Sequence, residues 1–196
     1  MNAGGIGAIL LAGGRGSRMG GVHKPLLEVG GRTLLDAALG AALDAGCDPI
    51  IVVGPADDAH ADLTWVREEP PFGGPAAAIV TALPLVAAPR VLVLACDLPR
   101  VADAVRVLLA APDMADGVCL EDAEGRRQWL TGVYRTDALR AAATTIPDAG
   151  RNAPVRSLLG SLAITAVAAS DAVAFDIDTW DDLNEARRDR DTKEEP

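Results

Sequence analysis

Short aliphatic runs alternate with longer amphipathic segments along the first half of the chain. The runs are continuous, as in strands that a parallel sheet buries on both faces. Between them, apolar residues return every three or four positions, as on one face of a helix. The pattern predicts strands at 6–12, 49–55 and 90–99 and helices at 33–45, from Pro75 onward and at 101–110.

Local signals mark where two of the helices begin. Thr33 and Asp36 have the spacing of a capping box, with Asp in place of Glu. Thr179 and Asp182 repeat that spacing near the end of the chain. The second pair predicts that a last helix covers residues 178–190.

The second half of the chain departs from this strict alternation. Two strand-like runs flank the polar turn "DAEGRR", which predicts an edge hairpin or the closure of a mixed sheet. The elements expected here are strands at 116–121, 128–135, 162–168 and 172–177 and helices at 136–143 and 154–160. No linker or repeat interrupts residues 1–190, so we expect one domain followed by a disordered tail at 191–196. The expected fold class is a single-domain, Rossmann-like α/β fold, with three α/β/α layers and a mostly parallel, mixed central sheet.

Composition narrows the class of protein. Hydrophobic residues make up 49% of the 196 positions but aromatic residues only 3%, so we expect an aliphatic core. The apolar runs are too short for a membrane span, and no basic segment precedes the first one as in a signal peptide. We therefore expect a cytoplasmic protein with no membrane partner, in which the widely spaced Cys47, Cys96 and Cys119 are free thiols. The net charge of −10 argues against a nucleic-acid partner.

A glycine-rich stretch, "LLAGGRGSRMGGVHKPLLEVGG", follows the first strand. It carries Arg15, Arg18 and Lys24 and no carboxylate before Glu28. Glycines let backbone N–H groups approach a polyphosphate closely, and the three cations can neutralise it without a competing acid nearby. The spacing fits neither a P-loop, which needs GK[ST], nor a dinucleotide GxGxxG, because Met19 occupies the last glycine position.

This stretch closely resembles the LAGGxxxRMGxxK signature of nucleotidyltransferases that activate a phosphorylated small molecule with a nucleoside triphosphate. Within that superfamily the chain looks most like the bacterial molybdenum cofactor guanylyltransferases. The resemblance covers most of residues 6–185. It rests on the opening loop and on "GGPAAAI" (73–79), "ACDLP" (95–99), "GVYRTDAL" (132–139) and "FDIDTWDDL" (175–183).

The resemblance implies a role for individual residues. Arg18 and Lys24 would hold the triphosphate and act in catalysis together with Asp97, the expected ligand of Mg²⁺, with Mn²⁺ as the alternative metal. Gly54 and Glu69 stand where the family often has Asn and Asp, and both positions concern the base and ribose. The nucleotide-binding residues expected from the resemblance are Leu11, Ala12, Gly13, Gly14, Arg15, Lys24, Gly54, Glu69, Gly74, Pro75 and Asp97.

Elementary chemistry agrees with these roles. Nucleotidyl transfer brings two anions together, so cations and alignment supply most of the catalysis and no protein nucleophile is needed. Asp97 follows an apolar strand and is placed to hold a metal, although capping the next helix is the alternative. Asp176 and Asp178 would share one face if the strand runs through them, and Asp178 is a second metal candidate or a helix cap.

Further polar positions complete the candidates. His23 is placed to touch phosphate, and His60 lies in a polar stretch where we expect it to be solvated; neither supports a zinc site. Asn152 and Arg156 stand where the family places loops that contact the acceptor. Arg126 and its neighbour are expected in an exposed turn.

The function expected from the resemblance is transfer of GMP from GTP to molybdopterin or its molybdenum form, with release of pyrophosphate. Three alternatives stay open. They are the cytidylyl version of the reaction, a guanylyltransferase for another small phosphate such as phospholactate, and a non-catalytic adaptor that binds nucleotide or pterin. We expect a monomer or weak oligomer, and a transient contact with other molybdenum cofactor proteins is a further open point.

Overall fold

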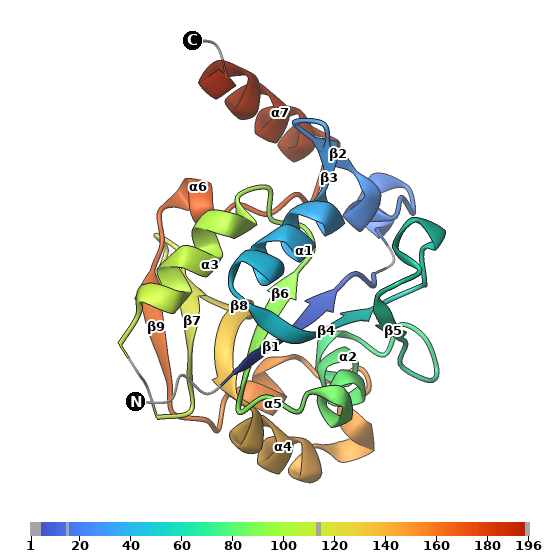
Figure 1. The fold of residues 1–196 in the computed structure, drawn as a ribbon, viewed down its shortest axis with the longest axis vertical. Helices are drawn as coiled ribbons and strands as arrows, with labels where there is room; N and C mark the ends of the chain where they lie inside the picture. Colours follow the sequence, from blue (N-terminus) through green and yellow to red (C-terminus); the bar gives the residue numbers. More distant parts are fainter. Residues whose placement is uncertain (1–4, 15, 113–114, 195–196) are drawn as a thin grey trace.

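The computed structural model describes residues 5–14, 16–112 and 115–194 (Figure 1). Its strands are β1 (Ile6–Leu11), β2 (Glu28–Val29), β3 (Arg32–Thr33), β4 (Cys47–Val53), β5 (Thr64–Val66), β6 (Arg90–Ala95), β7 (Gly117–Glu121), β8 (Arg127–Arg135) and β9 (Ile164–Ala168). Its α-helices are α1 (Leu34–Asp44), α2 (Pro75–Ala82), α3 (Val101–Ala110), α4 (Thr136–Thr145), α5 (Arg156–Leu159), α6 (Asp171–Ala174) and α7 (Trp180–Glu194). Short 3₁₀ turns are η1 (Ser17–Met19), η2 (Lys24–Leu26), η3 (Asp58–His60), η4 (Leu83–Leu85) and η5 (Pro147–Gly150).

The main sheet has the strand order β5-β4-β1-β6-β8-β7-β9. Strands β5, β4, β1 and β6 pair in parallel, β8 runs antiparallel to both of its neighbours, and β7 pairs in parallel with β9. In register, Leu11 lies between Val53 of β4 and Ala95 of β6. The carboxyl ends of these three strands therefore meet at one edge of the sheet, where ligands of parallel sheets bind.

Helices cover both faces of the sheet (Figure 1). Side chains of α1 and α3 pack against one face together with Leu10 of β1, whereas α2, α4 and α5 pack against the other face together with Ile9. Adjacent residues of β1 thus point to opposite faces of the sheet, because side chains alternate between the two faces along a strand. The predicted three-layer α/β fold with a mostly parallel, mixed sheet is confirmed, and its core is aliphatic.

A third apolar cluster packs the glycine-rich loop against α7 and the segment before it. Met19 of η1 and Leu34 at the start of α1 are buried with Ile177 and Leu183. The loop is therefore anchored at one side chain, and the segment before α7 lies against it although more than 150 residues separate them in sequence.

Three element predictions were wrong. The predicted strand at 172–177 is instead the short helix α6 followed by an extended segment, because the Ser170 carbonyl accepts from Val173 and Ala174 and closes a helical turn. Strand β6 ends at Ala95, before Asp97. The last helix runs to Glu194, beyond the predicted end at residue 190.

The cysteines are buried free thiols, as predicted. Burial raises the pKa of Cys47 and of Cys119 to about 11, so both thiols stay protonated at neutral pH. In the described part of the chain, none of the helices has the length and apolar character needed to cross a membrane.

Candidate active site

A cavity of about 350 Å³ opens at the edge where β1, β4 and β6 end. Its lining comes from those strand ends, from the loop before α2 and from β8. Six residues predicted to bind nucleotide line it: Leu11, Gly13, Gly14, Gly74, Pro75 and Asp97. The lining residues that the sequence analysis did not find are Val53, Glu68, Phe72, Ala78, Ala95 and Leu130.

Backbone contacts shape the floor of this cavity. The Ala12 N–H donates to the Val53 carbonyl at 2.9 Å, and the Cys96 N–H donates to the Leu11 carbonyl at 3.2 Å. A Cβ atom at Gly54 would lie 2.9 Å from the Ala12 carbonyl carbon, closer than any side chain tolerates. Glycine at position 54 therefore allows the end of β4 to lie close to the backbone of the glycine-rich loop. Gly54 contributes to the site through this close backbone approach rather than through a side-chain contact to the base.

Asp97 lies just past β6 and lines the cavity. Its Oδ1 is buried and has no hydrogen-bond partner. Burial, together with the charge of Asp176, raises the pKa of Asp97 to about 6, whereas Lys24 acts in the opposite direction. A buried carboxylate oxygen that lacks a hydrogen-bond partner and lies near other negative charges costs free energy. A divalent cation bound to this oxygen would offset that cost, so Asp97 fits the role of a metal ligand.

The acidic segment before α7 is fixed next to Asp97. The Ile177 N–H donates to the Asp97 carbonyl at 3.0 Å. Asp176, on one side of Ile177, is exposed, and partial desolvation together with the charge of Asp178 raises its pKa. The charges of Asp176 and Asp178 both act on Asp97, but the strand that was expected to put these two side chains on one face is not formed, and the segment lies outside the sheet.

Asp178 pairs with the cations that the sequence assigns to the triphosphate. Its Oδ1 lies 2.5 Å from Lys24 Nζ, and its Oδ2 pairs with Arg18 Nη1. The expectation that no carboxylate competes for these cations was therefore wrong, because the competing acid comes from a distant part of the chain. Arg15 lies outside the described residues.

The carboxylate of Asp178 does not cap α7. The predicted capping box is confirmed: Thr179 Oγ1 accepts from the Asp182 N–H at 3.2 Å, and Asp182 Oδ2 accepts from the Thr179 N–H at 2.7 Å. Asp182 Oδ2 also accepts from the Asp178 N–H at 2.9 Å. The backbone of Asp178 is therefore held in place while its carboxylate faces Lys24.

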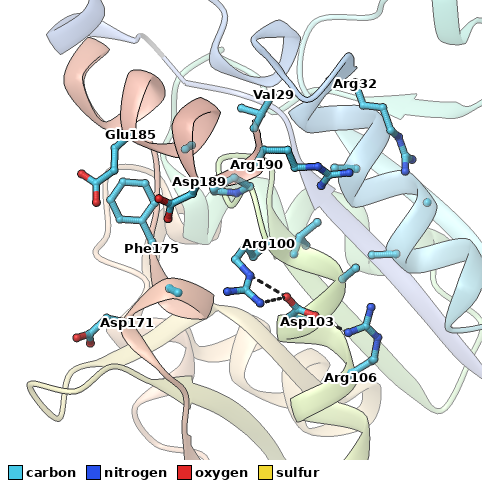
Figure 2. A pocket seen from close by; sticks show the side chains of 18 of the residues that line it. Val29, Arg32, Arg100, Asp103, Arg106, Asp171, Phe175, Glu185, Asp189 and Arg190 are labelled. Atoms are coloured by element: carbon cyan, nitrogen blue, oxygen red, sulfur yellow. Dashed lines mark hydrogen bonds and ion pairs between the residues drawn. The ribbon is translucent and has the colours of Figure 1, made fainter. Parts of the chain in front are cut away.

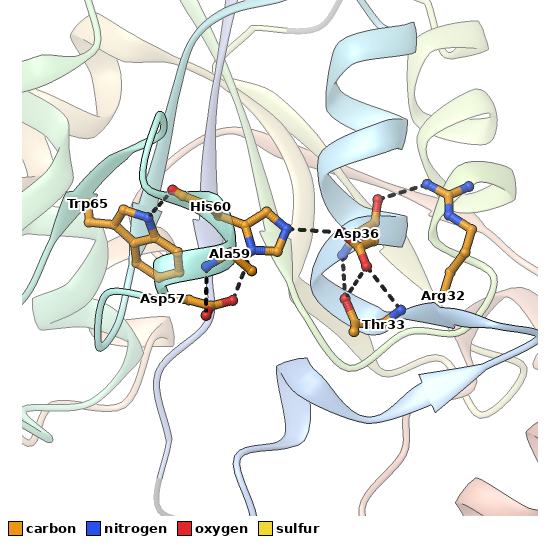
Figure 3. A network of polar contacts seen from close by, with 7 residues as sticks. All are labelled: Arg32, Thr33, Asp36, Asp57, Ala59, His60 and Trp65. Carbon is orange, nitrogen blue, oxygen red and sulfur yellow. Dashed lines mark hydrogen bonds and ion pairs between the residues drawn. The ribbon is translucent and has the colours of Figure 1, made fainter.

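Both histidines have structural contacts instead of the expected ones. His23 Nε2 donates to the Ala12 carbonyl at 2.8 Å, so that nitrogen links the two ends of the glycine-rich loop and is not offered to phosphate. His60 lies 2.9 Å from both Asp36 and Asp57 and has only 14% of its side chain exposed, so the expectation of a solvated histidine was wrong (Figure 3). It joins the 57–60 turn to the first turn of α1.

Glu69 is exposed and does not line the cavity, whereas its neighbour Glu68 does. Asn152 is also exposed, and its backbone N–H donates to the Gly73 carbonyl at 2.6 Å, which places it behind the loop that carries Gly74. Arg156, the first residue of α5, is exposed and outside the cavity lining.

A larger cavity of about 720 Å³ lies between α1, α3, α6 and α7 (Figure 2). None of the predicted site residues lines it. Asp103 in its wall already pairs with Arg100 and Arg106. The smaller cavity at the strand ends is therefore the candidate nucleotide site.

Within the described ranges, no group of three or more His, Cys, Asp or Glu side chains is arranged to hold a metal ion alone. Mg²⁺ in phosphate-binding enzymes is commonly held by one or two carboxylates together with substrate phosphates and water. Asp97 with its free oxygen fits that mode of binding.

Comparisons with known proteins show which family the whole chain resembles. The model of the MobA-like NTP transferase domain family matches residues 8–166, which is most of the chain. A probable molybdenum cofactor guanylyltransferase of Synechococcus elongatus is 40% identical over 104 residues, which are 48% of this chain and 52% of that protein. The chain thus spans about half the length of this relative.

Solved structures agree over nearly the whole chain. A nucleotidyl transferase from Methanothermobacter has a TM-score of 0.75 and 25% identity over 96% of this chain and 98% of that one. A Mycobacterium tuberculosis protein solved as a complex with manganese has a TM-score of 0.67 and 25% identity over 94% of this chain and 98% of that one. By its sequence match and its fold, the chain belongs to the MobA-like NTP transferase domain family.

Proposed function

We propose that this protein transfers GMP from GTP to a phosphate oxygen of a molybdopterin-type acceptor and releases pyrophosphate. The observation that carries the proposal is the meeting of three features at one sheet edge: a cavity of about 350 Å³, the cations Arg18 and Lys24, and the partnerless oxygen of Asp97. The guanylyltransferase name of the Synechococcus relative supports the choice of nucleotide and acceptor.

In this proposal the chain binds and aligns the reactants. The backbone of Gly13 and Gly14 lines the nucleotide cavity, so its N–H groups are available to phosphate oxygens. Lys24, which is largely buried, leaves Asp178 and neutralises charge on the triphosphate, and Arg18 does so from the exposed side. Asp97 would hold Mg²⁺, or Mn²⁺ as in the Mycobacterium structure, and the metal would supply charge neutralisation at the phosphates.

Asn152 and Arg156 remain candidates for contact with the acceptor, although they lie outside the cavity. The 2.6 Å hydrogen bond from the Asn152 N–H to Gly73 places this loop directly behind the rim of the cavity. An acceptor larger than the cavity would reach it. We place the reaction in the cytoplasm, where three buried thiols stay reduced.

The test is pyrophosphate release in a matrix of nucleotide and acceptor. GTP, CTP and ATP are each combined with molybdopterin, with phospholactate and with no acceptor, in the presence of Mg²⁺. The proposal expects release with GTP and molybdopterin. If only CTP among the nucleotides gives release, the protein catalyses the cytidylyl reaction. If only phospholactate among the acceptors gives release, the acceptor is a small phosphate other than molybdopterin. Tight nucleotide binding without release in any combination would indicate an adaptor.

A further inference from the structure

The nucleotide cavity has two acidic side chains in an otherwise apolar and glycine-rich lining. Asp97 lies beside Lys24 and the acidic segment. Glu68 follows β5 and lines the cavity from the side of the loop before α2. Asp97 is assigned to the phosphates and their metal, so Glu68 is the acidic group left for the base.

Glu68 is held in one orientation. Its Oε1 accepts from the Phe72 N–H at 3.0 Å. A Cβ atom at Gly73 would lie 3.4 Å from Glu68 Cγ and 3.1 Å from Ala77 Cβ, so glycine at this position leaves the room that Glu68 occupies. Among the described residues no arginine, lysine or histidine forms an ion pair with its carboxylate. An oriented carboxylate without a cation in an apolar cavity is available to hydrogen-bond donors of a ligand.

Phe72 supplies an aromatic surface at the same place. The residue is 45% exposed although it lines the cavity, and its φ of 67° puts it in the left-handed region. The Arg67 guanidinium lies 5.2 Å from the ring centroid. An exposed aromatic ring beside an apolar cavity offers a stacking surface to a planar base.

We propose that Glu68 recognises guanine, accepting hydrogen bonds from its N1–H and 2-amino group, while Phe72 stacks on the ring. This inference rests on the proposed function and names the residues that select its nucleotide. Guanine offers two adjacent donors on its Watson–Crick edge. Cytosine and adenine each offer one donor there, next to an acceptor lone pair that a carboxylate repels. A site that leaves a buried polar group unpaired discriminates strongly against the wrong ligand.

The first experiment uses the unaltered protein and nucleotide analogues. Equilibrium binding is measured with Mg²⁺ for GTP, for ITP, which lacks the 2-amino group, and for N1-methyl-GTP, which lacks the N1–H. We expect each analogue to bind at least about tenfold more weakly than GTP. Equal binding of GTP and ITP, or tighter binding of CTP than of GTP, would overturn the proposal.

The second experiment assigns the preference to a residue. Glu68→Gln keeps the shape of the side chain and is expected to bring the GTP-to-ITP ratio to within about threefold. Glu124→Gln, in the exposed turn between β7 and β8, is the matched control for loss of one carboxylate and should keep the full ratio. Phe72→Leu should weaken both nucleotides equally, because stacking does not depend on the 2-amino group.

Two results would assign the preference elsewhere. If Glu69→Gln abolishes the preference for GTP over ITP and Glu68→Gln does not, the exposed Glu69 recognises the base. If neither substitution changes this preference, the backbone alone selects the base. Because binding is measured without an acceptor, a guanine preference without transfer would refute the proposed function alone, and transfer without the Glu68 effect would refute this inference alone.

Discussion

The ion pairs of Asp178 predict that this side chain weakens nucleotide binding when metal is absent. Its carboxylate holds Lys24 Nζ at 2.5 Å and pairs with Arg18, so a triphosphate has to displace it from both cations. Asp178→Asn removes the negative charge with little change of shape. The Asp178 N–H, held by Asp182, keeps the segment in place in the variant.

The size of the effect follows from the exposure of the two pairs. The Arg18 side chain is 70% exposed, so its pair is screened and is worth at most about 1 kcal/mol. The Lys24 side chain is 19% exposed and Asp178 is 38% exposed, so this pair is less screened and lies toward the upper end of that range. Together they are worth about 1.4 kcal/mol, which is about tenfold in the dissociation constant of GTP.

Calorimetry in EDTA measures this directly. Asp178→Asn should bind GTP about tenfold more tightly than the unaltered protein, and the gain should shrink as salt concentration rises. Asp181→Asn, an exposed residue of the first turn of α7, is the matched control and should change little. Unchanged or weaker binding by Asp178→Asn in EDTA would refute the reasoning. If Mg²⁺ reverses the gain, Asp178 also holds the metal.

Three further variants test the site and the fold. Lys24→Ala should lower kcat by at least about 100-fold and GTP affinity by less than tenfold, because its charge matters most when charge develops at the phosphate; steady-state kinetics and calorimetry separate the two. Asp97→Asn should lower turnover by about 100-fold or more. Burial raises the folded pKa of Asp97 from 3.8 to about 6, so the carboxylate destabilises the fold progressively between these two pH values and fully above about pH 6. In EDTA this variant should therefore melt higher than the unaltered protein at pH 8 and not at pH 4. Hydrogen bonds that His60 donates to the carboxylates of Asp36 and Asp57 raise its pKa, so the contribution of His60 to stability is complete below pH about 6.5 and is lost as pH rises through the raised pKa. His60→Gln should therefore lower the melting temperature more at pH 5.5 than at pH 8.5, and an equal loss at both values would contradict this.

Local patterns were enough to predict every strand of the main sheet except β5, the capping boxes and the backbone part of the site. Leu11, Gly13 and Asp97 lie at or just beyond the ends of strands whose apolar runs are plain in the sequence, so the sheet brings them together. The run at 128–135 predicted a strand, but no local pattern specified that β8 lies antiparallel beside β6, where it contributes Leu130 to the cavity. The conformation of the loop before α2 determines that Glu68, and not the adjacent Glu69, lines the cavity. The order of residue types in the sequence does not specify this conformation.

The contact of Asp178 with Lys24 could not be predicted, because it joins positions 154 residues apart and depends on the docking of Ile177. It also answers why an acidic protein has a purely basic loop. Arg18 and Lys24 share the carboxylate of Asp178, which comes from elsewhere in the chain and offsets part of their positive charge. The same segment raises the pKa of Asp97. When a triphosphate takes Lys24 away, the three aspartates lose their nearest cation. A divalent cation then replaces the lost charge, which couples nucleotide binding to metal binding through the segment that carries Asp176 and Asp178.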